Sequence, residues 1–252
     1  MGPARSSSGA VDEGAVAQIV IIDTETTGLG HTAKPARKDG IVQVGFAYRD
    51  VEGTVRTWSE NCNPGEDLLR PGWADEALAV NGVPRDRIRA SPSAKLVAQQ
   101  LHTRLEGIRQ STRKPLELRA YNRDFDEPFL AARPWSVPSN IWGPCIMRAV
   151  TLYLEGPDAA WVGLRRATKR LGIDWPDGPP HDAGVDSHAA LLVLEELLIR
   201  LRGGRRGNGR NTRGDGPDSP WRPQPGCQFC ATDGPHDGDH GYFCDGDFYS
   251  LR

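Results

Sequence analysis

Two carboxylates, Asp23 and Glu25, lie two residues apart at the end of the apolar run 17–23. Residues two apart in an extended strand project from the same face of a sheet, so both side chains can ligate one metal ion. Gly28 follows closely and permits a sharp turn. The pattern predicts a metal site at a strand end, beside an exposed turn. Ordinary polar residues that terminate a strand are the alternative.

Asp186 is the second candidate ligand, because it begins an apolar face at helical spacing. That face continues through Ala190, Val193, Leu197 and Leu201. The Asp186 carboxylate is therefore expected to point inward, toward the sheet. An unpaired buried carboxylate costs several kcal/mol, whereas a divalent cation shared with Asp23 and Glu25 would compensate the charge.

Asp126 and His181 have weaker support from their surroundings alone. Asp126 precedes an expected helix with Pro128 in its first turn, an arrangement typical of helix capping. His181 follows Pro179-Pro180 and is expected on a loop, where an imidazole beside carboxylates could accept a proton from water. Lone histidines are more often structural or exposed. His188 is the second candidate for a base.

The order of these residues resembles the three motifs of the DEDDh-type 3′→5′ exonucleases, which are ribonuclease H-like proteins that include polymerase proofreading subunits and DNA- and RNA-trimming enzymes. The matching segments are 23–29, 122–126 and 181–186, and the resemblance spans 17–202. Weaker likenesses lie at 41–45, at Asn63-Pro64 and at 81–83. Relatives often have His where this chain has Asn81.

The resemblance implies that Asp23 bridges two Mg²⁺ or Mn²⁺ ions. Glu25 and Asp186 would hold the first ion, Asp126 would support the second, and His181 would act as the base. The 3′-terminal nucleotide is expected at a small group of residues: Thr26, Thr27, Gly28, Leu29 and Asn122.

The function predicted on this basis is release of 5′-mononucleotides from the 3′ end of DNA, in proofreading or repair. Because the motifs serve both polymers, trimming of RNA 3′ ends is the alternative within the same class. A non-catalytic module that binds nucleic acid or a polymerase, and a metal-dependent phosphatase, are the alternatives outside it.

Hydrophobic periodicity predicts an α/β fold, with a mixed sheet flanked by helices. Strands are expected at 17–23, 40–48, 54–59 and 116–121, with a hairpin at 49–53 and an antiparallel pair beside the first strand. Helices are expected at 92–108, after Asp126, at 145–154, at 162–171 and at 184–202. By resemblance, this sheet is ribonuclease H-like.

Composition divides the chain into a flexible leader (1–16), the exonuclease domain (17–202), a Gly/Arg/Pro-rich linker (203–226) and a small Cys/His segment (227–252). The last segment offers ligands for one structural Zn²⁺. The expected ligands are Cys227, Cys230, His240 and Cys244, with His236 as a substitute. A tail with free cysteines is the alternative.

The chain has 252 residues, a formal net charge of −2 and five cysteines. This charge gives no general attraction to nucleic acid, so DNA or RNA 3′ ends would be bound through local patches and cations. No apolar window is long enough to span a membrane, and no secretory signal is evident, so the protein is expected in the cytoplasm. A polymerase or repair partner would be a separate polypeptide.

Overall fold

The computed structural model describes residues 16–29, 39–72 and 74–204. The elements in chain order are β1 (Gln18–Thr26), β2 (Ile41–Arg49), β3 (Val55–Asn61), η2 (Glu66–Leu68), α1 (Asp75–Asn81), α2 (Arg85–Ala90), α3 (Ala94–Thr112), β4 (Leu116–Arg119), α4 (Arg123–Ala131), η3 (Ser139–Ile141), α5 (Ile146–Leu154), α6 (Leu164–Leu171) and α7 (Ala183–Gly204).

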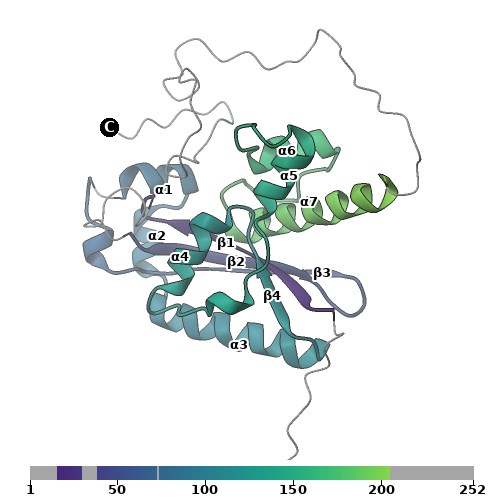
Figure 1. Ribbon diagram of the computed structural model, residues 1–252. Helices are drawn as coiled ribbons and strands as arrows, with labels where there is room; N and C mark the ends of the chain where they lie inside the picture. The colour runs from purple at the N-terminus through teal and green to yellow at the C-terminus, as the bar shows by residue number, and fades with distance from the viewer. Residues whose placement is uncertain (1–15, 30–38, 73, 205–252) are drawn as a thin grey trace, which may run out of the picture.

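The four strands form one mixed sheet in the order β3-β2-β1-β4 (Figure 1). β1 pairs antiparallel with β2 and parallel with β4, and β2 pairs antiparallel with β3. The hairpin between β2 and β3 is closed where the Gly53 N–H donates to the Asp50 carbonyl, at 3.0 Å. The predicted α/β class, the hairpin and the antiparallel pair beside the first strand are confirmed.

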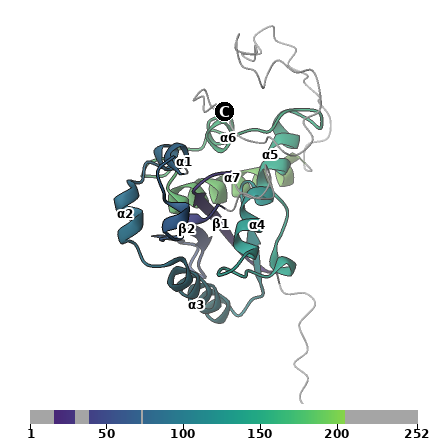
Figure 2. The ribbon, with the colours of Figure 1, turned by 90° about the vertical axis from the view of Figure 1, so that its left-hand side faces the viewer.

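Helices cover both faces of the sheet, which is why β1 is apolar along most of its length. Val20 and Ile22 pack on the side of α3 and α4, and Ile21 packs against α5, α6 and α7 on the other side. Figure 2 shows β1 and β2 between α3 and α7. By the same alternation, Asp23 and Glu25 face the α7 side.

The beginning of α7 lies directly on β2 at Gly45, the residue paired with Asp23 across the two strands. A Cβ atom at Gly45 would lie 2.4 Å from the Ala183 carbonyl carbon and 2.4 Å from the Gly184 nitrogen. The Ser187 hydroxyl lies 3.2 Å from the Gly45 carbonyl oxygen and 2.6 Å from that of Ala183. Only glycine at this position lets the helix approach so closely.

Several predicted boundaries were wrong, and three of them bear on the site. β1 does not end at Asp23 but continues to Thr26, because β2 pairs with it along this whole length. α4 begins at Arg123, before Asp126, so Pro128 lies beyond the first turn. α7 continues to Gly204, so residues 203–204, which were assigned to the linker, belong to the helix.

The short helices α1 and α2 were not predicted. They pack on Val42 through a separate small cluster: Leu69, Ala74, Leu78 and Ile88. Leu201, expected on the apolar face that begins at Asp186, is exposed instead, and so is Leu96 of the helix expected at 92–108. Both lie near a helix terminus, Leu96 in the first turn of α3 and Leu201 in the last turn of α7.

The leader up to residue 15, the linker from 205 onward and the Cys/His segment lie outside the described residues. The zinc ligands predicted there, Cys227, Cys230, His240 and Cys244 with His236, therefore stay predictions. Among the helices in the described ranges, none is long and apolar enough to cross a membrane.

Replacing Gly45 with Ala is expected to destabilise the fold by about 1–3 kcal/mol, because the new methyl group would push the start of α7 off the sheet. The matched control is Gly107→Ala on the exposed side of α3, where an added Cβ meets nothing within 4 Å. The control is expected to be neutral or to stabilise by up to about 1 kcal/mol. Urea unfolding measures both. Equal stability of the two variants would contradict the close approach at Gly45.

Candidate active site

Asp23 and Glu25 lie on β1 where α7 begins above it. Glu25 is buried, with 8% of its surface exposed, and Asp23 is half-buried. Across the strand pair, Asp23 lies opposite Gly45 and Glu25 lies opposite Gln43. The missing side chain at Gly45 gives α7 its place beside the two carboxylates.

Asp126 reaches the same end of β1 from α4. It is 1% exposed, and its Oδ1 accepts hydrogen bonds from the Thr24 backbone N–H (3.0 Å) and from the Thr24 hydroxyl (2.7 Å). Thr24 lies between the two acidic residues of β1, so Asp126 is tied to the strand that carries them. The helix-capping interpretation of Asp126 is wrong, because the residue lies inside α4 and its carboxylate bonds to β1.

Asp182 precedes α7 and caps it. Its Oδ1 accepts hydrogen bonds from the Gly184 N–H (3.0 Å) and the Val185 N–H (3.2 Å), which would otherwise lack partners at the helix N-terminus. Asp186 follows in the first turn, with its N–H donating to the Asp182 carbonyl at 2.8 Å. The cap therefore fixes the position of Asp186.

His181 lies outside the helix, as predicted, and has a positive φ of 61°. Few non-glycine residues adopt this left-handed conformation. The His181 backbone N–H donates to the Asp186 carboxylate. The backbone therefore turns at His181 before α7 begins, and this turn brings the imidazole to the carboxylates.

Glu25, His181 and Asp186 each offer a possible ligand atom, and the three atoms lie within 4.8 Å of one another. Asp186 Oδ1 is buried and has no hydrogen-bond partner. Buried polar atoms without partners are rare in folded proteins. Carboxylate oxygens are the ligands that Mg²⁺ and Mn²⁺ prefer, so the donor set fits a divalent cation of this kind.

The electrostatics of the site also favour a cation. Burial, together with the neighbouring carboxylates, raises the pKa of Asp23 and of Glu25 well above their ordinary values. Burial raises the pKa of Asp126 to about 7 even though Thr24 donates to it, and burial raises that of Asp186 to about 7. These groups resist ionisation together unless positive charge is placed among them.

The turn after β1, where the terminal nucleotide was predicted, is held by its own side chains. The Thr26 hydroxyl donates to the Gly28 carbonyl (2.6 Å), and the Thr27 hydroxyl accepts from the Gly40 N–H (3.0 Å). Thr27 is fully buried, whereas Gly28 and Leu29 are half-exposed. The accessible part of this turn is therefore Gly28 and Leu29.

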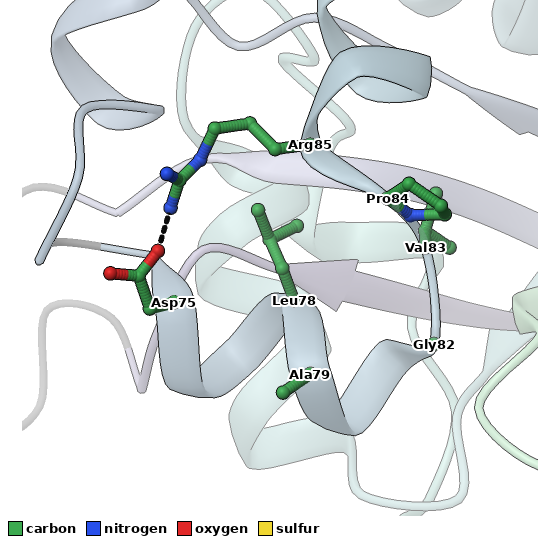
Figure 3. A pocket seen from close by; sticks show the side chains of 7 residues that line it. All are labelled: Asp75, Leu78, Ala79, Gly82, Val83, Pro84 and Arg85. Carbon is green, nitrogen blue, oxygen red and sulfur yellow. Dashed lines mark hydrogen bonds and ion pairs between the residues drawn. The ribbon is translucent and has the colours of Figure 1, made fainter.

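Asn81, at the end of α1, supports the same turn. It is buried, and its side-chain amide donates to the Thr26 carbonyl at 3.1 Å. Just beyond Asn81, the α1–α2 connection lines a surface pocket of about 390 Å³ (Figure 3). In Figure 3, Arg85 and Asp75 form an ion pair at one side of the pocket.

Two other residues were predicted for the site, Asn122 as a contact of the terminal nucleotide and His188 as the second candidate for a base. Asn122 immediately precedes α4, and its carbonyl, not its side chain, accepts the first helical hydrogen bonds, from Phe125 and Asp126. His188 lines a pocket of about 120 Å³ with Trp58 of β3 and does not belong to the group that contains His181.

Four residues that support the site were assigned no role from the sequence: Thr24, Gln43, Asn81 and Asp182. Gln43 carried a signal, because a polar residue inside a strand that is buried on both faces needs a specific partner. Asp182 also carried one, since Asp immediately before a helical pattern is a typical N-cap. Nothing local to Thr24 or Asn81 indicates their partners, which are 102 and 55 residues away in the chain.

Known structures share this fold. The nuclease domain of 3′hExo, described as a DEDDh family member bound to rAMP, matches with a TM-score of 0.57 and 17% identity over 72% of this chain and 92% of that chain. Exonuclease I of E. coli, in complex with a dT13 oligonucleotide, matches with a TM-score of 0.53 and 21% identity over 76% of this chain and 42% of that one. These likenesses show the ribonuclease H-like fold.

One relative is similar to this chain in sequence. The chain is 28% identical, over 186 residues, to a DNA polymerase III subunit epsilon-like protein of Rhodobacter capsulatus, and the match covers 73% of this chain. It spans only 24% of that relative's length. No family model matches the chain.

The fold is ribonuclease H-like, and one of the structures that share it is the nuclease domain of a DEDDh family member, the family that the three motifs resemble. In sequence the chain is similar to an epsilon-like protein, so the resemblance indicated by the three motifs is confirmed.

The raised pKa values predict how stability depends on pH in the metal-free protein. The unfolded chain releases its carboxyl protons near pH 4, whereas folded Asp126 and Asp186 hold theirs until about pH 7. The folded state therefore binds more protons between these values, and its stability falls as pH rises from 4 through 7. Thermal melting should show a lower Tm at pH 8 than at pH 5.5.

Mn²⁺ added at pH 8 should restore the Tm, since a ligand at 100 times its Kd stabilises the folded state by about 2.7 kcal/mol. The Asp186→Asn variant should show less of both effects. A Tm that rises steadily from pH 5.5 to pH 8 without metal would contradict the proposed electrostatics.

Proposed function

We propose that this chain hydrolyses the terminal phosphodiester bond at the 3′ end of DNA and releases 5′-mononucleotides, in proofreading or repair. The observation that carries the proposal is the meeting of acidic side chains from β1, α4 and α7, together with His181, at one end of β1. Structural stability alone gives no reason to bury these carboxylates together, because their mutual repulsion opposes folding.

Each acidic residue has a proposed role. Glu25 and Asp186 would hold one divalent cation, Asp126 would support a second, and Asp23, coupled electrostatically to all three, would bridge them. Two Mg²⁺ or Mn²⁺ ions bound there would supply positive charge that favours deprotonation of the attacking water and offsets charge on the attacking and leaving oxygens.

His181 is the proposed general base. Its ring lies among the carboxylates of Glu25 and Asp186, which favour the protonated imidazolium after it accepts a proton. It is half-exposed, so water and substrate can reach it. The Asp186 carboxylate holds the His181 backbone and so limits the positions that the ring can take.

The proposed substrate site is the accessible end of the turn after β1. Gly28 and the apolar Leu29 would contact the terminal nucleotide, with the buried Thr26 and Thr27 holding the shape of the turn. Asn122, at the start of α4, would lie on the other side of the strand end.

DNA is the proposed polymer because the relative is named as a polymerase III epsilon-like protein and exonuclease I is seen with a DNA oligonucleotide. A specific observation keeps RNA as the second candidate. A matching 3′-exonuclease is described as recognising the 3′ end of a histone mRNA stem-loop. The epsilon-like relative also supports the proposal of a polymerase or repair protein as partner.

Asp186→Asn is expected to abolish cleavage, with a loss of at least about 10³-fold, because the amide keeps the shape of the side chain but removes the charge that would hold the cation. The control is Asp174→Asn, an exposed residue, which should cleave like the wild type. The substrates are 5′-labelled DNA and RNA of identical sequence, single-stranded and with frayed duplex ends. A ladder that shortens from the 3′ end is expected, faster on DNA.

Two results would contradict the proposal. Wild-type protein that leaves every 3′ end untouched in Mg²⁺ and in Mn²⁺ would exclude the activity, and a faster ladder on RNA would replace DNA by RNA as the substrate.

His181→Gln is expected to lower kcat by about 10²- to 10⁴-fold, the range typical of a lost general base, while Mn²⁺ affinity stays within a few-fold of the wild type. The matched control is His188→Gln on α7, which should retain activity. Single-turnover cleavage and calorimetric Mn²⁺ titration separate the two effects. A large loss of Mn²⁺ affinity in His181→Gln would make this residue a metal ligand instead.

A further inference from the structure

Gln43 is a polar residue in the middle of a buried strand, and it is only 5% exposed. It lies directly opposite Glu25 in the antiparallel pair of β1 and β2. Residues opposite each other in such a pair project from the same face, with Cβ atoms about 4.5–5.5 Å apart. Gln43 is therefore a side neighbour of a proposed metal ligand.

Both ends of the Gln43 amide bond to the start of α7. Its Oε1 accepts a hydrogen bond from the Ala183 N–H at 2.8 Å, and its Nε2 donates to Asp182 Oδ2 at 3.0 Å. The first bond satisfies a backbone donor that the helix itself leaves free. The second holds the capping carboxylate, whose other oxygen accepts from Gly184 and Val185.

These contacts connect the two halves of the acidic site. Glu25 belongs to the sheet, whereas His181 and Asp186 belong to the segment that enters α7. Gln43 lies beside Glu25 and bonds to residues between His181 and Asp186 in the chain. Gly45, two residues further along β2, leaves the space in which the start of α7 lies. A side chain that bonds at two points fixes both distance and rotation of the helix start.

We propose that Gln43 is a positioning residue that sets the distance between Glu25 on β1 and the pair His181 and Asp186 at α7, and so determines the affinity of the site for divalent cations. This inference rests on the proposed function in taking the acidic site as a metal site. The hydrogen bonds of the Gln43 side chain go to Ala183 and Asp182, and Gln43 acts on the site through these two residues.

The test is calorimetric titration of the full chain with Mn²⁺. Gln43→Met keeps the length of the side chain and removes both hydrogen bonds, and Mn²⁺ affinity should fall about 10- to 100-fold, as for other residues that orient metal ligands. The matched control is Gln18→Met at the other end of β1, where the glutamine donates to the Arg49 carbonyl at 3.0 Å. It should bind Mn²⁺ like the wild type.

A second control separates positioning from loss of stability. Val97→Ala removes buried volume from α3 on the opposite face of the sheet and should lower the Tm without changing Mn²⁺ affinity. Amide hydrogen exchange gives an independent measurement, because the Ala183 N–H should exchange at least about 10-fold faster in Gln43→Met than in Gln18→Met. If Gln43→Met does not fold, Gln43→Asn, too short to reach both partners, replaces it and should weaken Mn²⁺ binding at least about 3-fold.

Wild-type Mn²⁺ affinity in a folded Gln43 variant would overturn the inference while leaving the nuclease proposal intact. Conversely, wild-type protein that binds Mn²⁺ but cleaves no oligonucleotide would overturn the proposed function, and the comparison between Gln43 and Gln18 would still decide the role of Gln43.

Discussion

The structure depends on one close approach, that of the start of α7 to β2 at Gly45. Because Gly45 has no side chain, the Ala183–Gly184 peptide lies against the strand, next to the position that pairs with Asp23. A helix seated a few ångströms further out would leave Asp186 and His181 too far from Glu25 to form one group. Glu25, close to this contact on the neighbouring strand, is buried.

That burial has an electrostatic cost, which explains the other features of the site. Asp23, Glu25, Asp126 and Asp186 all have raised pKa values, with burial as the largest cause. Hydrogen bonds from Thr24 offset part of the cost at Asp126, and the amides at the start of α7 favour negative charge near Asp186. The rest of this electrostatic cost would be offset most directly by divalent cations, which would also supply the positive charge that phosphodiester hydrolysis needs.

The sequence was enough to predict the parts of the site that follow local periodicity. Alternation along β1 places Asp23 and Glu25 on one face, and helical spacing turns Asp186 inward. Asp126 was misinterpreted from local sequence, because Asp near the start of a helix is typical of a cap and its true partner, Thr24, is far away in the chain. Its inclusion in the site came from the family resemblance. The short α1 and α2 lack enough turns for periodicity to show, and their packing on Val42 is a tertiary contact.

The proposed function requires the acidic group at the end of β1 to hold divalent cations. The most direct test is anomalous X-ray diffraction from crystals of the protein grown at pH 7.5 with Mn²⁺. We expect an anomalous peak within about 2.0–2.6 Å of carboxylate oxygens of both Glu25 and Asp186, with Asp23 contacting the same ion. Well-ordered carboxylates with no anomalous peak among them at saturating Mn²⁺ would contradict it.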